Sequence, residues 1–225
     1  MHFHIVSIFP EIFDNFFQTS IIWKSIQSWK IKKTIYNPRD YTKDKHKQID
    51  DEIYWWGAWL LIKAKPIIDC VNDIISNISK DNFKIIYLSP SDKIWNQSMA
   101  KDYFTKYDNI ILISGRYEGI DYRFEKYFYD KFPDKFEKIS IWKYILFGWE
   151  LASMVLVESI SRYIPWVVQD YQSVVDESYS PSKNMENIEY PQYTRPYEVC
   201  GYKVPDVLLS WNHKKINDWR EENLQ

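Results

Sequence analysis

Two strand–helix units follow one another in the middle of the chain and constrain its fold more than any other feature. Residues 83–88 and 109–114 are short runs of mostly apolar side chains, which predicts two buried strands. The apolar spacing predicts an amphipathic helix over 66–78, and another helix over 95–106 between the two strands. We expect the Ser-Pro pair at 89–90 to end the first strand. Such alternation is typical of α/β proteins, so we predict a parallel sheet with helices on both faces.

The segments on either side extend this pattern. Strands are expected at 3–9, 34–36 and 138–141, and helices at 10–18, 23–29 and 121–130. After Pro165 the periodicity weakens, and the Ser, Asp, Glu and Pro residues that follow are typical of a linker. We therefore divide the chain into a domain over 1–165, a linker over 166–187 and a small, mostly helical appendage over 188–225.

One stretch, residues 140–154, runs from the end of an apolar strand through a loop into a helix. Apolar residues recur at helical spacing from Leu151 onward, which predicts a largely buried helix. In open α/β sheets, ligands bind where loops leave the carboxyl ends of strands. The predicted ligand-binding loops are therefore residues 142–149 (loop 142–149) and residues 115–119 (loop 115–119). By itself, the Gly-Arg-Tyr-Glu-Gly pattern of loop 115–119 supports only a tight turn with room for a ligand.

The composition excludes several classes of protein. With 225 residues, of which 45% are hydrophobic, the chain can bury a sizeable core. The net charge of −2 argues against a globally basic nucleic-acid binder, although residues 24–48 carry eight Lys or Arg against two acids. A solvated loop face explains that segment about as well as phosphate binding does. The two cysteines are too few for a disulfide framework, and no apolar run reaches membrane-spanning length, so we expect a soluble, cytoplasmic protein without a membrane partner.

A series of motifs in fixed order covers nearly all of the chain. They include Ser-Gly-Arg-Tyr-Glu-Gly-Ile-Asp at 114–121 and Tyr-Thr-Arg-Pro at 193–196, and others lie at 7–11, 37–40, 50–61, 87–90, 140–154, 161–165 and 208–213. With these motifs the sequence resembles the bacterial tRNA (guanine-N1)-methyltransferases, SPOUT-type enzymes that use S-adenosylmethionine and have a trefoil knot. The resemblance implies methyl transfer to N1 of the guanine immediately 3′ of the anticodon in tRNA. It also implies a homodimer, a C-terminal trefoil knot in the α/β domain, and tRNA binding by an appendage that looks truncated.

The resemblance assigns cofactor binding to three loops at strand ends. Their residues are Tyr87, Leu88, Ser89, Pro90, Gly115, Tyr117, Glu118, Ser140, Ile141, Trp142, Tyr144, Leu146, Gly148 and Trp149. In the family the glutamate at position 118 lies beside the methyl donor and has been linked to a magnesium requirement, so Glu118 is also the candidate Mg2+ ligand. From the residues alone, an enclosed Glu118 is more often a structural carboxylate.

Methylation of guanine N1 needs a general base, and a cationic or hydrogen-bonding partner for the charge that builds on O6. The resemblance places the base at Asp176 or Glu177 and the partner at Arg162. Family members carry an aspartate directly before Ser-Phe, whereas here Glu177 precedes Ser178 and Tyr179. We therefore predict Glu177 as the base, with Asp176 as the alternative. Without the family, each of these charged residues reads as ordinary surface charge.

Four residues are expected to contact tRNA, namely Arg39, His46, Arg195 and His213. His46 lies in a polar, charge-dense loop, and from the residues alone it is most simply an exposed surface histidine. Two other functions stay open at this point. One is a catalytically inactive, knotted RNA-binding protein, and the other is a knotted methyltransferase that acts on another RNA.

Tryptophan stands at positions where the family carries glycine, namely Trp23, Trp29, Trp55, Trp56, Trp59, Trp142, Trp149, Trp166 and Trp211. The chain has 5 glycines and 11 tryptophans, whereas a typical chain of this length has roughly 16 glycines. One hypothesis is that the gene uses UGA for glycine and was translated with UGA as tryptophan. The other is a genuinely Trp-rich set of loops, in which case Trp142 and Trp149 are expected to fill the cofactor cleft.

Overall fold

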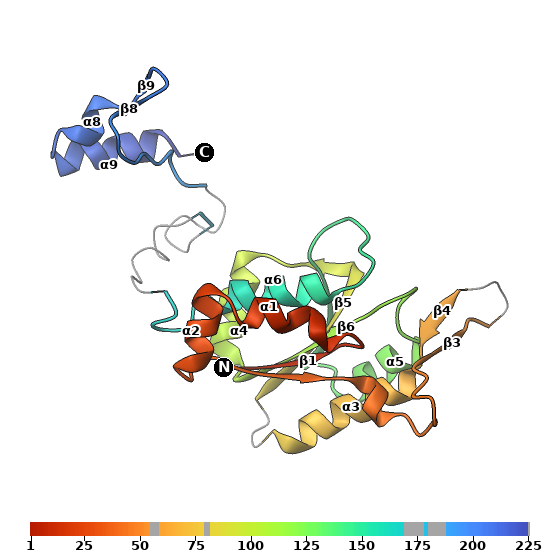
Figure 1. Ribbon diagram of the computed structural model, residues 1–225. Coiled ribbons are helices and arrows are strands. Elements are labelled where there is room, and N and C mark those ends of the chain that lie inside the picture. Colours follow the sequence, from red (N-terminus) through yellow and green to blue (C-terminus); the bar gives the residue numbers. More distant parts are fainter. Residues whose placement is uncertain (55–58, 79–81, 169–177, 180–187, 225) are drawn as a thin grey trace. The chain divides into compact units, whose positions relative to one another are not determined.

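The computed structural model describes residues 1–54, 59–78, 82–168, 178–179 and 188–224. The chain forms two compact units, residues 1–169 and 170–225 (Figure 1). The first unit contains a large sheet and most of the helices, and the second is small.

A five-stranded, fully parallel sheet forms the centre of the first unit, with the strand order β2-β1-β6-β5-β7. Its strands are β1 (His2–Val6), β2 (Lys32–Tyr36), β5 (Phe83–Ile94), β6 (Asn109–Ser114) and β7 (Phe136–Ser140). The predicted α/β class and the parallel sheet are confirmed. A separate antiparallel hairpin pairs β3 (Asp50–Glu52) with β4 (Leu60–Ile62).

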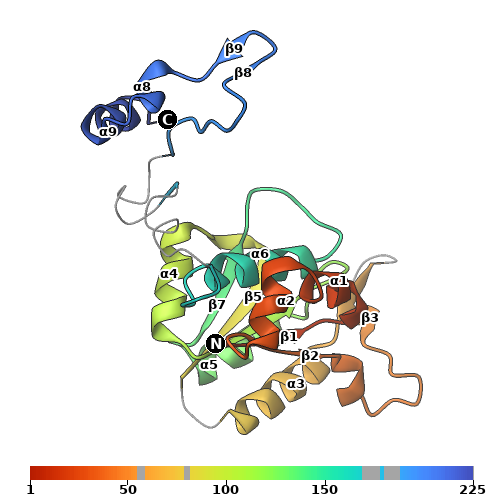
Figure 2. The same ribbon diagram turned by 60° about the vertical axis from the view of Figure 1, so that its left-hand side comes forward.

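Helices cover both faces of the sheet (Figures 1 and 2). One face carries α3 (Ala64–Asn77) and α5 (Arg123–Lys131), and the other carries α1 (Asp14–Phe17), α2 (Ser20–Gln27), α4 (Gln97–Lys106) and α6 (Glu150–Ser161). Two 3-10 helices, η1 (Pro10–Phe13) and η2 (Pro38–Tyr41), complete the described elements of this unit. Both helices predicted around the first strand are therefore present, each within two residues of its expected start.

Aromatic side chains fill the core between the sheet and α5. Phe124 and Phe128 are fully buried, and their ring centroids lie 5.7 and 5.8 Å from that of Phe136 on β7. Burial of each ring contributes about 2 kcal/mol or more to the free energy of folding. The start of α5, which follows loop 115–119, is thus firmly anchored to the sheet.

Strand β5 continues further than the sequence predicted. Leu88 and Lys93 both align with Ile139 of β7, so the four residues between them bulge out of the ladder. The prediction that residues 89–90 end the strand is therefore wrong. Pairing with β7 stops after Leu88 and resumes at Lys93, because the chain returns to the edge of β7 after the bulge.

The second unit contains a two-stranded hairpin and two helices. The hairpin pairs β8 (Glu198–Val199) with β9 (Tyr202–Lys203), and the helices are α8 (Asp206–Leu209) and α9 (His213–Glu222). Trp219 of α9 packs near Tyr190 and Tyr193, with ring centroids 6.3 Å apart in each pair. Across the part of the chain that the structure describes, no helix has the length and apolar character needed to cross a bilayer.

Candidate active site

The carboxyl ends of three neighbouring parallel strands meet at one edge of the sheet. Leu88 of β5 pairs with Ser114 of β6 and with Ile139 of β7, so the segments that follow these strands begin side by side. The structure thereby brings together the three segments in which cofactor-binding residues were predicted.

Main-chain contacts join loop 115–119 to loop 142–149. Arg116 and Gly148 form an isolated antiparallel bridge, and the N–H of Trp149 donates a 3.2 Å hydrogen bond to the carbonyl of Gly115. A Cβ atom on Gly148 would overlap the side chain of Arg116, so a larger residue here would force that side chain to shift. The two loops are adjacent walls of one site.

A buried carboxylate ties these walls to the first strand. Glu150, the first residue of α6, is 1% exposed. Its Oε1 accepts a 2.9 Å hydrogen bond from the Ser7 hydroxyl, and its Oε2 lies 2.9 Å from Nε of Arg116. The Arg116 guanidinium also lies 4.8 Å from the centre of the Phe9 ring. Since a buried charge is tolerated only when it is paired, these contacts fix the distance between β1, loop 115–119 and α6.

Tyr87 supports loop 115–119 from within the core. Its side chain is buried, and burial raises the pKa of its hydroxyl to about 12. The hydroxyl lies 3.3 Å from where a Cβ on Gly119 would stand, and Gly119 has a φ of +118°. A side chain at Gly119 would therefore meet both a strained backbone and the phenol. Tyr87 lies where it was predicted, but its side chain contacts the loop itself.

The two indoles expected in the cofactor cleft lie in different surroundings. Trp149 is 8% exposed, and its Cδ1 lies 3.8 Å from the position of a Cβ on Gly115. Trp142 is 57% exposed, and its carbonyl accepts a 2.7 Å hydrogen bond from the Ser140 hydroxyl. The Trp142 side chain is thus more exposed to solvent than that of Trp149, and whether either indole fills the cleft stays a prediction. Trp149 does pack beside Gly115.

The remaining residues of loop 142–149 expose much apolar surface. Phe147 and Ile145 are 99% and 78% exposed, and Tyr144 is about half exposed. Ile141 and Leu146 are half-buried. Contiguous exposed apolar side chains mark places where a ligand or a partner binds.

The bulge at the end of β5 forms the third predicted segment. Leu88 and Ser89 are buried, whereas Pro90 is exposed. The Ser89 hydroxyl lies 2.9 Å from that of Ser91 and accepts a hydrogen bond from the Ser91 N–H. These contacts keep the bulge compact beside the two loops.

Glu118, the candidate Mg2+ ligand, lies on the exposed side of loop 115–119 next to the exposed Tyr117. Its N–H donates a 3.3 Å hydrogen bond to the carbonyl of Leu60 in β4. Among the residues described here, no group of three or more His, Cys, Asp or Glu could hold a metal ion.

The structure describes one of the three predicted catalytic residues. Arg162 is the C-cap residue of α6; it is half-buried and has partners within the chain. Asp176 and Glu177 lie outside the described residues. The structure thus places Arg162 on the helix that starts at the site, at its opposite end.

The four predicted RNA contacts fall on separate units. Arg39 and His46 belong to the first unit, where Nη1 of Arg39 donates a 3.3 Å hydrogen bond to the carbonyl of Lys47 and His46 is exposed. Arg195 and His213 are exposed in the second unit.

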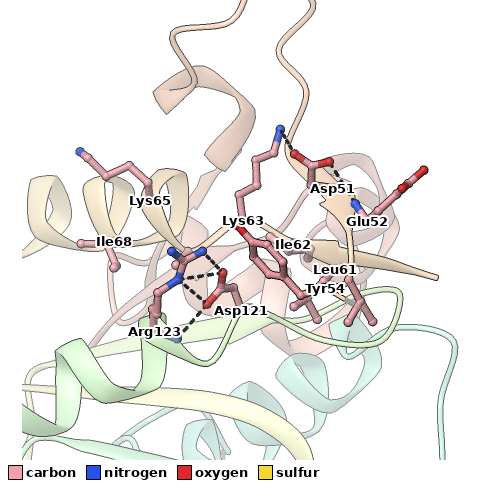
Figure 3. A pocket seen from close by; sticks show the side chains of 12 residues that line it. Asp51, Glu52, Tyr54, Leu61, Ile62, Lys63, Lys65, Ile68, Asp121 and Arg123 are labelled. Atoms are coloured by element: carbon pink, nitrogen blue, oxygen red, sulfur yellow. Dashed lines mark hydrogen bonds and ion pairs between the residues drawn. The ribbon is translucent and has the colours of Figure 1, made fainter. Parts of the chain in front are cut away.

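Sequence reasoning did not predict a pocket of about 1170 Å³ beside hairpin β3–β4 (Figure 3). Two pairs of its charged side chains contact each other: Nζ of Lys63 lies 3.4 Å from Asp51, and Nε of Arg123 donates a 3.0 Å hydrogen bond to Asp121. Its floor includes Ile62, whose N–H donates to the carbonyl of Gly119 over 3.0 Å. These acids and bases come from separate segments, so no local pattern shows which of them pair.

Three loops at the carboxyl ends of neighbouring parallel strands define a ligand-binding α/β protein. The sequence matches the family described as tRNA (Guanine-1)-methyltransferase TrmD over residues 1–225. The tRNA (guanine-N(1)-)-methyltransferase of Clostridioides difficile (strain 630) is 42% identical over 222 residues, which cover 99% of this chain and 91% of the relative. Those of Finegoldia magna and Ehrlichia canis are each 40% identical, and the alignments cover 99% and 98% of this chain and 89% and 88% of the relatives. The chain belongs to the S-adenosylmethionine-dependent tRNA (guanine-N1)-methyltransferase family.

Proposed function

We propose that the protein transfers a methyl group from S-adenosylmethionine to N1 of the guanine immediately 3′ of the anticodon in tRNA. Family membership supports the reaction. The main-chain contact between loop 115–119 and loop 142–149 is the observation that supports a site for it in this chain. A tRNA transcript with guanine at that position should accept label from S-adenosylmethionine, and one with adenine there should not. Labelling of both transcripts, or of neither, would contradict the proposal.

S-adenosylmethionine would be held by the loops at the ends of β5, β6 and β7. Main-chain groups of Gly115 and Gly148 and apolar side chains such as Leu146 suit its adenine and methionine parts. When bound, the cofactor supplies an electrophilic methyl group on a sulfonium centre. The buried indole of Trp149, packed beside Gly115, is the feature of this chain that fits the cofactor least.

Proton removal from N1 is assigned to Glu177, and stabilisation of charge on O6 to Arg162. A carboxylate accepts the N1 proton as a general base, and a guanidinium donates hydrogen bonds to the developing oxyanion. Arg162 lies at the end of α6, shortly before the segment that carries Asp176 and Glu177. Asp176 is the alternative base; neighbouring side chains of an extended segment point to opposite sides, so its use would require the segment to rotate.

Tryptophan is a poor fit at several of the positions where the family carries glycine, which supports the recoding hypothesis. Trp29, Trp166 and Trp211 have φ values of 60°, 67° and 54°, in the left-handed region that glycine favours. Their side chains are 79%, 78% and 89% exposed. Each left-handed residue costs about 1–2 kcal/mol, and here the indole gains little burial in return.

The two tryptophans outside this set have well-packed surroundings. Trp95 stacks on Tyr103 with centroids 5.1 Å apart, and its Nε1–H donates a 2.9 Å hydrogen bond to Ser159. Trp219 lies among the tyrosines of the second unit. The contrast supports glycine as the intended residue at the exposed positions. The codons decide the matter: UGA at most of the nine positions agrees with it, and UGG at most of them contradicts it.

A homodimer is proposed from the family resemblance and from an apolar face on α6. Leu151 and Val155 lie one turn apart on this helix and are 58% and 44% exposed. Most of this helix is buried. Two exposed aliphatic side chains one turn apart on such a helix are typical of a surface that a partner covers. Sedimentation should give a dimer that Leu151→Glu dissociates; a monomeric unaltered protein would contradict this.

A trefoil knot near residues 140–154 is proposed on the resemblance alone, since knots are rare among folds. We further propose that residues 1–165 form the cofactor-binding domain, that 166–187 form a linker, and that 188–225 bind tRNA. An experimental structure in which residues 140–154 pass through no other loop would contradict the knot. As a tRNA-modifying enzyme the protein would act in the cytoplasm, and Glu118 is the residue proposed to bind Mg2+.

A further inference from the structure

The second unit contains a pocket of about 980 Å³ that the proposed reaction does not use. It is lined by Tyr193, Thr194, Arg195, Pro196, Tyr197, Val204, Leu208 and Leu209. Seven of these eight residues are uncharged, so among the described lining residues the guanidinium of Arg195 is the only charge. Ligand pockets of this size are commonly apolar with a few fixed polar groups.

Two tyrosine rings in this lining are held in place yet remain accessible. Tyr193 is 48% exposed and packs against Trp219, with centroids 6.3 Å apart. Tyr197 is 45% exposed; its hydroxyl donates a 3.4 Å hydrogen bond to Asp206, and its carbonyl accepts one from Val204. Aromatic rings that the fold already orients lose little entropy when a flat ligand stacks on them.

Arg195 supplies the positive charge in the lining of this pocket. Its side chain is exposed, and among the residues that the structure describes it forms no hydrogen bond or ion pair. The cations of the pocket beside β3–β4 differ in this respect, because Lys63 and Arg123 are each paired with an aspartate. An unpaired guanidinium beside apolar and aromatic side chains suits a ligand with a flat ring and a nearby anion.

We propose that this pocket binds one unstacked base of the tRNA and that Arg195 pairs with a phosphate next to that base. Proteins bind single-stranded RNA by stacking splayed-out bases on aromatic side chains, and an arginine pairs with phosphate through two parallel hydrogen bonds. The proposal rests on tRNA being the substrate, as above. It narrows the tRNA binding proposed for residues 188–225 to one pocket, one base and its neighbouring phosphate.

The test measures the affinity of the full-length chain for an unmodified tRNA transcript by fluorescence anisotropy over a range of salt concentrations. Tyr197→Leu keeps an apolar side chain but removes the stacking face, and should weaken binding about 5- to 100-fold with an unchanged salt slope. Tyr197→Phe should bind within about twofold of the unaltered chain. Arg195→Gln should weaken binding and reduce the salt slope by about 1.

Tyr202→Leu is the matched control, because Tyr202 is an 83% exposed tyrosine of the same unit that does not line the pocket. It should bind tRNA within about twofold of the unaltered chain. At saturating tRNA, Tyr197→Leu should retain kcat while KM for tRNA rises, which a general folding defect would not produce.

Three results would overturn the pocket proposal. If the unaltered chain binds and methylates tRNA but Tyr197→Leu binds as tightly, the pocket does not hold a base, and the proposed function stands. If Tyr197→Leu and Tyr202→Leu weaken binding equally, the effect is not specific to the pocket. If Tyr197→Leu turns a dimer into a monomer on sedimentation, the pocket is a protein contact. A chain that neither binds nor methylates tRNA would overturn the proposed function as well.

Discussion

The hydroxyl of Ser7 donates a 2.9 Å hydrogen bond to Oε1 of Glu150, across 143 positions of sequence. The same carboxylate pairs with Arg116, so one buried group connects the end of β1, loop 115–119 and the start of α6. The distances between the segments that form the proposed cofactor site depend on this carboxylate, because each of the three segments meets it separately.

Glu150→Gln should lower the free energy of unfolding by about 1–3 kcal/mol, because the half-buried Arg116 loses the charged acceptor that the buried Glu150 provides. It should also weaken S-adenosylmethionine binding at least several-fold, since the two loops are no longer held at a fixed distance. Chemical denaturation and calorimetry measure the two effects. Glu158→Gln, at an exposed position of the same helix, should change neither quantity, and equal effects of both variants would contradict the role of Glu150.

Trp149→Gly should raise the affinity for S-adenosylmethionine about tenfold or more, because removal of the indole opens space beside Gly115. Trp142→Gly should have a smaller effect, since that indole is largely in solvent. Calorimetry with the two single variants and the double variant separates the contributions. A larger gain from Trp142→Gly than from Trp149→Gly would show that the buried indole does not obstruct the site.

Trp23 lies in α2 and Trp29 lies just beyond its end. Replacing each of them with glycine should change the free energy of unfolding in opposite directions. Trp29→Gly should raise the free energy of unfolding by about 1 kcal/mol, because glycine accepts a φ of 60° without strain. Trp23→Gly should lower it by about 0.5–1 kcal/mol, because Trp23 lies inside the helix. Thermal melts of the two variants provide the comparison, and the same sign for both would refute the backbone argument.

The stability of the first unit should fall as the pH decreases from about 6.5 to about 4. Burial, together with His4, lowers the pKa of His2 from its ordinary value of 6.5 to about 4, and burial also lowers the pKa of His4. The unfolded chain therefore takes up these protons at a higher pH than the folded chain. The contribution of the two neutral histidines to the free energy of unfolding is complete above pH 6.5 and decreases as the pH falls toward 4. The two imidazole centroids lie 3.8 Å apart, which makes double protonation unfavourable.

His2→Asn should make the dependence of unfolding free energy on pH shallower over this range. His46→Asn, at an exposed histidine, should leave it unchanged. Denaturation curves collected at several pH values provide the measurement. A decrease of the same steepness in the His2→Asn variant would rule out His2 as a source of the acid sensitivity.

Glu177→Gln, in a protein with glycine restored at the nine positions, should slow single-turnover methyl transfer about a hundredfold or more. Affinity for S-adenosylmethionine should remain nearly unchanged, because a general base acts on the guanine. Asp176→Asn is the matched variant. If Asp176→Asn produces the large decrease and Glu177→Gln does not, the base is Asp176.

The strands of the sheet could be predicted from sequence because their signals are local. The apolar run at 109–114 coincides with β6. The continuation of β5 past residues 89–90 could not be predicted, since it depends on pairing with β7. A Ser-Pro pair is a turn signal in isolation, whatever strand lies beside it.

The site was predicted as a set of loops but not as a set of contacts. Strand–loop–helix order placed loop 115–119 and loop 142–149 at the sheet edge. No periodicity pairs Glu150 with Ser7 or Arg116, because an ion pair between distant segments leaves no trace in local spacing. The direction of the Trp142 side chain was likewise set by the path of the loop, which the sequence does not specify.

The bond between Ser7 and Glu150 also sets an order of events during protein synthesis. Ser7 leaves the ribosome early, and its acceptor is added 143 residues later, so neither it nor Arg116 has this carboxylate partner while most of the sheet is being made. Contacts between residues so far apart in sequence form late and slowly in folding. A nascent chain that ends just before residue 150 would contain strands β1 to β7 yet lack the carboxylate that links the end of β1 to loop 115–119.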